Sequence, residues 1–88
     1  MKLNPEFVIQ AVADSTMLVP VGDAAAKVHG ILQLNSTAAF IVECLKDDTT
    51  EDKIKEALDK EYDGTEEEFI QSIRTILSKL RECGALIE

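Results

Sequence analysis

The sequence has few of the residues that catalysis, metal binding and phosphate binding need. It contains one histidine, two cysteines and four glycines among 88 residues. No nucleophile stands beside a base, and Cys44 and Cys83 lack the paired spacing of metal ligands or of a disulfide framework. The glycines are scattered, so no phosphate-binding loop is predicted. We therefore expect no enzyme activity, no metal site and no cofactor.

Long apolar runs are also missing. The first residues include Pro5 and Glu6, where a secretory signal needs an unbroken apolar run. No stretch approaches the roughly 18 consecutive apolar residues of a membrane span. We therefore expect a cytoplasmic protein without a membrane partner. A chain of 88 residues with 45% hydrophobic content is long enough for one core, which predicts a single domain over 1–88.

Basic residues are fewer than acidic ones, and the formal net charge is −8. Residues 1–46 carry three basic and four acidic groups, whereas residues 47–88 carry six and thirteen. Affinity for nucleic acids depends largely on cations that displace counterions from the phosphates. The acidic second half of the chain therefore disfavours a nucleic-acid partner and favours a basic one.

The first 34 residues have the pattern of β-structure. Residues 7–21 are apolar or β-branched on both sides of Asp14-Ser15, which predicts a β-hairpin. Its second strand should stop pairing near Pro20, because proline lacks an N–H. After a loop or short turn over 22–27, a period of two predicts a third strand over 28–34. One face of this strand is expected to carry Val28, Gly30, Leu32 and Leu34, and the other His29, Ile31 and Gln33.

From residue 35 the apolar period becomes about 3.6, which predicts three helices to the end of the chain. The starts and ends are indicated by capping residues, with Asp52 and Glu68 in capping-box spacing from Thr49 and Thr65. The helices are expected to begin at Asn35 or Ser36, at Thr49-Thr50 and at Thr65, and to end at Asp47-Asp48, at Asp63-Gly64 and at Gly84. A short extended tail follows. This order predicts an α+β domain, in which helices cover one face of a small antiparallel sheet.

The segment Gly30-Ile31-Leu32-Gln33-Leu34-Asn35-Ser36-Thr37-Ala38-Ala39-Phe40-Ile41 resembles the strand-to-helix signature of the PqqD family, the coenzyme PQQ synthesis protein D group. Its core is Leu-Asn-x-Thr-Ala-Ala. Residues 50–54 and 58–63 are similar to the second helix of the family, and Ile73, Leu77, Leu80, Gly84 and Leu86 are similar to its third helix and tail. The resemblance implies a winged-helix-turn-helix-like fold with a three-stranded antiparallel sheet followed by three helices.

The resemblance also implies a function. Such modules are non-catalytic peptide chaperones that bind the leader segment of a ribosomally synthesised precursor peptide and present it to a modifying enzyme, commonly a radical SAM maturase. The leader joins the third strand as an added β-strand, because an open strand edge offers unpaired N–H and C=O groups. The longer connection over 22–30 and the acidic helices depart from the members of the PQQ pathway, so another modifying enzyme remains open as the partner.

On this basis the third strand and the third helix form the leader-binding groove. Ile70, Arg74 and Leu77 lie to one side of the apolar stripe of that helix, so we expect them to border the groove, with the core as the open alternative for Ile70 and Leu77. Arg74 and Arg81 are cations that would attract acidic leader residues. The predicted leader-binding residues are Val28, His29, Gly30, Ile31, Leu32, Gln33, Ile70, Ile73, Arg74, Leu77 and Arg81.

Two other functions stay open. A winged-helix fold is shared with many DNA-binding regulators, although the third helix carries four acidic and three basic residues. Acyl-carrier proteins are small and acidic and attach their phosphopantetheine arm to a serine that opens a helix, as Ser36 does here. The triplet Asn35-Ser36-Thr37 stands where these carriers have Asp-Ser-Leu, and the strands predicted before it do not fit an all-helical carrier.

Overall fold

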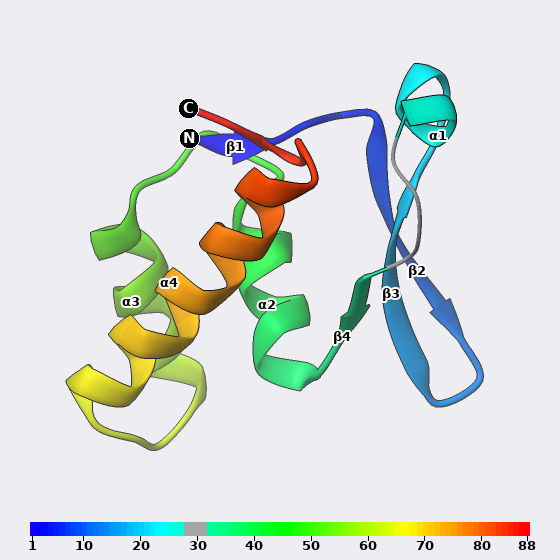
Figure 1. The fold of residues 1–88 in the computed structure, drawn as a ribbon. Helices are drawn as coiled ribbons and strands as arrows, with labels where there is room; N and C mark the ends of the chain where they lie inside the picture. Colours follow the sequence, from blue (N-terminus) through cyan, green and yellow to red (C-terminus); the bar gives the residue numbers. More distant parts are fainter. Residues whose placement is uncertain (28–31) are drawn as a thin grey trace.

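The fold combines a three-stranded antiparallel sheet, a two-stranded sheet and a group of helices (Figure 1). The structure is a computed structural model, and it describes residues 1–27 and 32–88. The elements are β1 (Lys2–Leu3), β2 (Phe7–Val12), β3 (Ser15–Pro20), α1 (Asp23–Lys27), β4 (Leu32–Leu34), α2 (Ser36–Cys44), α3 (Glu51–Glu61), α4 (Glu66–Glu82) and β5 (Leu86–Ile87). The predicted α+β class with a three-stranded antiparallel sheet is confirmed. The sequence predicted a loop or a short turn over residues 22–27, and the structure forms the short helix α1 there. The pairing of β1 with β5 was not predicted.

The predicted hairpin is formed by β2 and β3. Phe7 pairs with Pro20 and Val12 with Ser15, so the ladder ends at the proline as expected. Between the strands the chain turns at Ala13, whose φ of 55° lies in the left-handed region. The outer face of β2 leaves Val8 and Val12 exposed. Since the order of the sheet is β2-β3-β4, β2 forms one of its two edges.

The strand β4 forms the other edge of this sheet. It pairs antiparallel with β3, with Leu32 opposite Leu18 and Leu34 opposite Thr16. Leu34 is buried, Gln33 is exposed and Leu32 is half-buried, which agrees with the predicted alternation. The part of the predicted strand over 28–31 lies outside the described residues. No described strand pairs with the outer edge of β4.

Side chains cap the starts of α2 and α4 as their sequences predict. The amide N–H of Ala38 donates to Oδ1 of Asn35 at 2.8 Å. The amide N–H of Glu68 donates to Oγ1 of Thr65 at 3.2 Å. The Asn35 cap fixes the point at which the chain turns from β4 into α2.

The cap of α3 differs by one residue from the prediction. Thr50, and not Thr49, is the capping residue, and its Oγ1 accepts from the amide N–H of Lys53 at 3.3 Å. Thr49 is held elsewhere, because its own N–H donates to the carbonyl oxygen of Met1 at 2.8 Å. The predicted capping box between Thr49 and Asp52 is therefore wrong.

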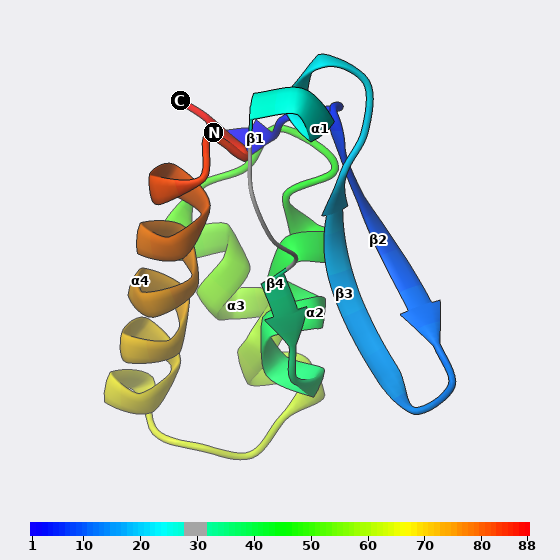
Figure 2. The same ribbon diagram turned by 45° about the vertical axis from the view of Figure 1, so that its right-hand side comes forward.

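One hydrophobic core joins the helices to the inner face of the sheet. Its helical part includes Ile41, Leu58 and Leu80, whereas Ala57, Tyr62 and Ile70 are half-buried. Tyr62 packs edge-to-face against Phe40, with ring centroids 5.6 Å apart. In both ribbon views α2, α3 and α4 lie together on one side of the hairpin (Figures 1 and 2). None of the described helices is long and apolar enough to cross a membrane.

The chain reverses sharply after α4 and brings its two ends together. Gly84 has a φ of 76°, and the amide N–H of Ala85 donates to the carbonyl oxygen of Leu80 at 2.8 Å. The amide N–H of Gly84 also donates to the carbonyl oxygen of Arg81, at 3.2 Å. The two hydrogen bonds together form a Schellman motif. The following strand β5 pairs with β1, which the sequence did not predict.

Candidate functional site

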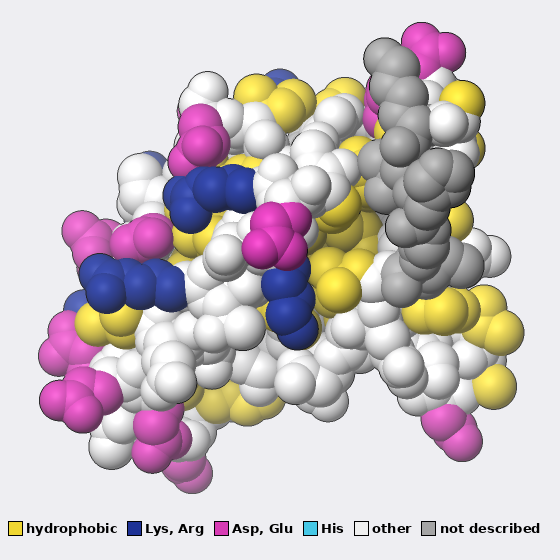
Figure 3. Space-filling model, in the orientation of Figure 1, with side chains coloured by type: hydrophobic (Ala, Val, Ile, Leu, Met, Phe, Trp, Pro, Cys, Tyr) yellow, Lys and Arg dark blue, Asp and Glu magenta, His cyan; other side chains and the backbone are white. Residues whose placement is uncertain are grey.

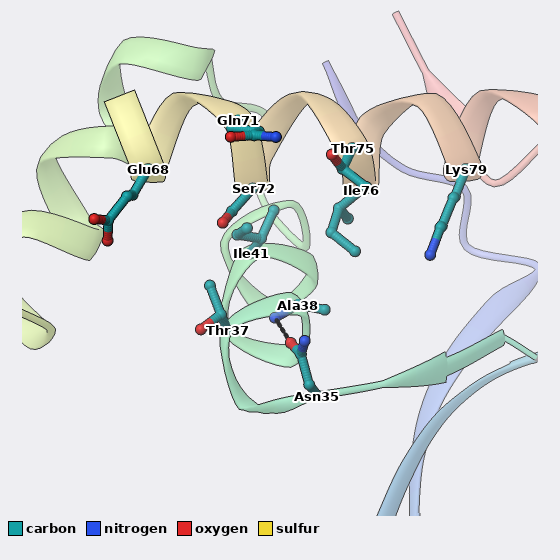
Figure 4. A pocket seen from close by; sticks show the side chains of 10 residues that line it. All are labelled: Asn35, Thr37, Ala38, Ile41, Glu68, Gln71, Ser72, Thr75, Ile76 and Lys79. Carbon is teal, nitrogen blue, oxygen red and sulfur yellow. Dashed lines mark hydrogen bonds between the residues drawn. The ribbon is translucent and has the colours of Figure 1, made fainter. Parts of the chain in front are cut away.

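A cavity of about 460 Å³ opens between α4 and the start of α2, beside the end of β4. We refer to it as the cleft. Its lining residues are Asn35, Thr37, Ala38, Ile41, Glu68, Gln71, Ser72, Thr75, Ile76 and Lys79 (Figure 4). The cleft therefore brings together residues from two helices that are some thirty positions apart in the chain.

The floor of the cleft is apolar. Ala38 and Ile41 of α2 and Ile76 of α4 belong to the buried core, yet they also line the cleft. The space-filling view shows hydrophobic side chains at the surface of this face of the molecule, next to basic side chains (Figure 3). A ligand that enters the cleft can bury apolar side chains against the floor, which is the main source of binding free energy in such sites.

The wall that α4 contributes is polar and mostly uncharged. Gln71, Ser72 and Thr75 supply hydrogen-bond donors and acceptors along its middle, while Glu68 and Lys79 supply one charge of each sign at its two ends. Figure 4 shows the side chains of Ser72 and Lys79 pointing from α4 toward the side on which α2 lies, with Glu68 at the other end of the wall. The wall therefore combines neutral hydrogen-bonding groups with a charge at each end.

The edge of β4 that does not pair with β3 faces the side of the molecule where α4 lies. In both ribbon views β4 stands between α4 and β3, with its free edge toward α4 (Figures 1 and 2). β4 leads directly into Asn35, which lines the cleft. The edge of β4 with which no described strand pairs is thus next to the cleft, which is the arrangement that β-strand addition requires.

The residues predicted in the third strand are only partly described. Leu32 and Gln33 belong to β4, with Leu32 packed against the core and Gln33 exposed. The predicted contacts at Val28, His29, Gly30 and Ile31 lie outside the described residues.

The residues predicted on α4 do not lie at the cleft. Ile70, Ile73 and Arg74 line a separate cavity of about 90 Å³ together with Glu51 and Asp52 of α3. Ile70 and Arg74 lie on the side of α4 that faces α3, and Ile73 belongs to the buried stripe that separates this side from the cleft. Helical spacing alone does not show on which side of that stripe the sheet lies, so the sequence could not place these residues relative to the cleft, and their part in leader binding stays a prediction.

Leu77 and Arg81 are likewise engaged elsewhere. Leu77 has 0% exposed surface and does not line the cleft, so it belongs to the core, which was the open alternative. Nη2 of Arg81 donates to Oε1 of Glu88 at 2.8 Å. This hydrogen bond raises the pKa of Arg81 and lowers that of Glu88, so both groups stay charged near neutral pH.

Sequence reasoning missed the cleft wall, although a signal was present. In an acidic chain the solvent face of a helix normally carries charges, but α4 has Gln71, Ser72 and Thr75 together on one face. The absence of charge on this strip agrees with the depletion of charged residues at the core of interfaces.

The described residues that line the cleft include no histidine and no cysteine. Among the residues that the structure describes, no group of three or more histidine, cysteine or acidic side chains is placed to hold a metal ion. Burial, followed by the nearby Glu43, raises the pKa of the Cys44 thiol, which keeps it protonated and weakly nucleophilic. The arrangement offers hydrogen bonds, apolar contacts and a sheet edge, and these are the means of binding a peptide.

These features define a small α+β module with an open strand edge beside a cleft. The sequence profile of the family described as "Coenzyme PQQ synthesis protein D (PqqD)" matches residues 8–86. The chain therefore belongs to the PqqD family, as its strand-to-helix signature indicated.

Two solved structures have a similar fold. One is described as "TbiB1 in Complex with the TbiA(beta) Leader Peptide"; it has a TM-score of 0.75 and 19% sequence identity, and the match covers 98% of this chain and 94% of that one. The other is "Lasso peptide synthetase B1 complexed with the leader peptide", with a TM-score of 0.74, 25% identity and coverage of 99% and 96%. No curated protein sequence matches the chain.

Proposed function

We propose that this protein binds the leader segment of a ribosomally synthesised precursor peptide, which adds to β4 as a further antiparallel strand and places its side chains in the cleft. The observation that carries the proposal is the open edge of β4 beside the cleft. Membership of the PqqD family and the likeness to two structures with bound leader peptides support it.

The two parts of the site have different tasks in this proposal. Main-chain hydrogen bonds to β4 hold the peptide in an extended form without regard to its sequence. Alternate side chains of the peptide then point toward α4 and enter the cleft, where the apolar floor and the polar wall select among sequences. Affinity on the order of micromolar is expected, because ordering a disordered leader offsets much of the contact free energy.

The protein itself contributes no reacting group in this proposal. It presents the bound precursor to a modifying enzyme, and the PqqD family makes a radical SAM maturase the first candidate for this partner. We place both partners in the cytoplasm, where precursor peptides are synthesised. The free thiols Cys44 and Cys83 fit a reducing compartment.

Residue-resolved hydrogen exchange tests the proposal. The probe is the leader peptide of the precursor encoded beside this gene, added to the ¹⁵N-labelled protein. Amides of β4 that point to its open edge should exchange more slowly in the complex, while amides of β2 at the other edge of the same sheet should not change. Chemical-shift changes should gather on Ser72, Thr75 and Lys79.

Two results would contradict the proposal. One is the absence of binding by a folded sample at high micromolar peptide concentration. The other is binding that leaves the exchange of the β4 amides unchanged, since the peptide would then occupy another surface.

A further inference from the structure

The cleft carries one charge at each end, and this asymmetry has consequences for any peptide that lies along it. Glu68 lies at the end formed by the first turn of α4, and Lys79 lies about three helical turns further on. No ion pair involves either side chain among the residues that the structure describes. Both charges are exposed and available to a ligand.

The direction of a bound strand follows from the direction of β4. Figure 4 shows that β4 reaches Asn35 from the side of the cleft where Lys79 lies. β4 therefore runs from the Lys79 end toward the Glu68 end, opposite to α4 (Figure 1). Both pairings within this sheet are antiparallel. An added strand that continues the pattern has its N-terminal part near Glu68 and its C-terminal part near Lys79.

The spacing of the two charges sets a spacing in the peptide. Eleven residues of helix at 1.5 Å per residue place Glu68 and Lys79 about 16 Å apart along the axis. An extended strand advances about 3.4 Å per residue, so about five residues span this length. Residues that point to the same face are separated by even numbers, and the matching positions are therefore four or six residues apart.

We infer that the cleft selects leader segments with a basic residue followed, four or six positions later, by an acidic residue, with an apolar residue between them on the same face. This inference rests on the proposed function and deepens it. The basic residue pairs with Glu68, the acidic residue pairs with Lys79, and the apolar residue lies on the floor formed by Ile41 and Ile76. The reverse order of charges places like charges together at both ends.

The magnitude of this selection is modest for each pair. Each exposed ion pair contributes little, but the reversed order replaces two attractions with two repulsions. We expect the favoured order to exceed the reversed order by at least about threefold in binding.

A display library of random peptides of about twelve residues, long enough to cover the cleft at any offset, is the probe. The immobilised full-length protein selects from it, and the two charge orders are counted at spacings of four and six. The wild type should enrich the base-before-acid order by about threefold or more over the starting library. The exchanged variant E68K/K79E should enrich the opposite order. Selection in about 1 M salt should remove the preference, because the Debye length falls to about 3 Å.

A matched control separates this effect from general changes in charge. The variant E67K/R74E also exchanges an acid near the start of α4 for a base further on, and it leaves the net charge unchanged. Both residues are exposed and neither lines the cleft, so this variant should keep the wild-type order. Circular dichroism of each variant shows that it is folded.

The outcomes are distinguishable. If the wild type enriches no peptide, both the inference and the proposed function are wrong. If it enriches peptides without a charge order, or with acid before base, the inference is wrong and the proposed function stands. If E67K/R74E reverses the order as E68K/K79E does, the charges act at long range and not in the cleft, which also overturns the inference.

Discussion

Arg74 and Thr75 are neighbours in the chain, yet their side chains line two different cavities beside α4. Thr75 lines the cleft beside β4, whereas Arg74 lines the small cavity between α4 and α3. This pair distinguishes the side of the helix that faces the proposed peptide from the side that does not.

A bulky side chain at position 75 should therefore block peptide binding, while the same side chain at position 74 should not. We expect Thr75→Trp to lower the affinity for the leader peptide by on the order of tenfold or more, because the indole occupies the cleft. Arg74→Trp should leave the affinity within about twofold of the wild type. Fluorescence anisotropy with a labelled leader measures both. Equal losses in the two variants would show that the peptide does not lie along the cleft.

Leu77 and Ile70 provide a test of the packing of α4. Leu77 has no exposed surface, so Leu77→Ala should lower the free energy of unfolding by about 2–5 kcal/mol. Ile70 is half-buried, and Ile70→Ala should cost roughly half as much. Urea unfolding followed by circular dichroism measures the two values. A smaller loss for Leu77→Ala than for Ile70→Ala would contradict the observed orientation of the helix.

The caps of α2 and α3 separate stability from binding. Asn35→Ala and Thr50→Ala each remove a capping hydrogen bond, and each should lower the free energy of unfolding by about 1 kcal/mol. Leader binding should weaken for Asn35→Ala, because Asn35 lines the cleft and joins β4 to α2. Thr50 is remote from the cleft, so Thr50→Ala should bind the leader as the wild type does. Calorimetric titration with the leader measures the affinity of both variants. If Thr50→Ala also lost affinity, the weaker binding of Asn35→Ala would have to be attributed to lower stability and not to a contact in the cleft.

Gly84 should be intolerant of a side chain for conformational reasons. Its φ of 76° lies in the left-handed region, and a Cβ there would meet no atom within 4 Å. Gly84→Ala should therefore lower the free energy of unfolding by about 1–2 kcal/mol without changing leader affinity. Gly84→Asn should cost less, because asparagine enters this region more readily. Thermal unfolding measures the stability of the two variants. A higher melting temperature for Gly84→Ala than for Gly84→Asn would contradict this explanation.

The sequence predicted those parts of the fold that depend on local patterns. The hairpin around Asp14, the cap at Asn35 and the helix end at Gly84 each have a signal within a few residues. The pairing of β1 with β5 joins segments from the two ends of the chain, and two-residue strands carry no periodicity that would reveal it. Local sequence patterns therefore predicted the individual helices and strands, whereas the pairing of the two chain ends became visible only in the structure.

The predicted site and the cleft share the third strand and the last helix, but the predicted residues on that helix do not line the cleft. The edge strand and the last helix were identified, because a resemblance of motifs covers both. The choice between Arg74 and Thr75 depends on how α4 is rotated against the sheet, and an amphipathic pattern fixes only the buried stripe between them. The prediction selected Arg74 for its positive charge in an acidic segment, whereas the structure places Thr75 at the cleft.

The strand β2 has a consequence for how copies of this protein behave together. It is the second edge of the sheet, and it carries the exposed side chains of Val8 and Val12. Bare apolar edges of this kind tend to pair with one another and begin aggregation. The net charge of −8 opposes such contacts by repulsion, but this protection disappears near the isoelectric point of about 4.5. Purified samples should therefore be kept well above that pH, and a Val8→Lys variant should stay dispersed in mild acid for longer.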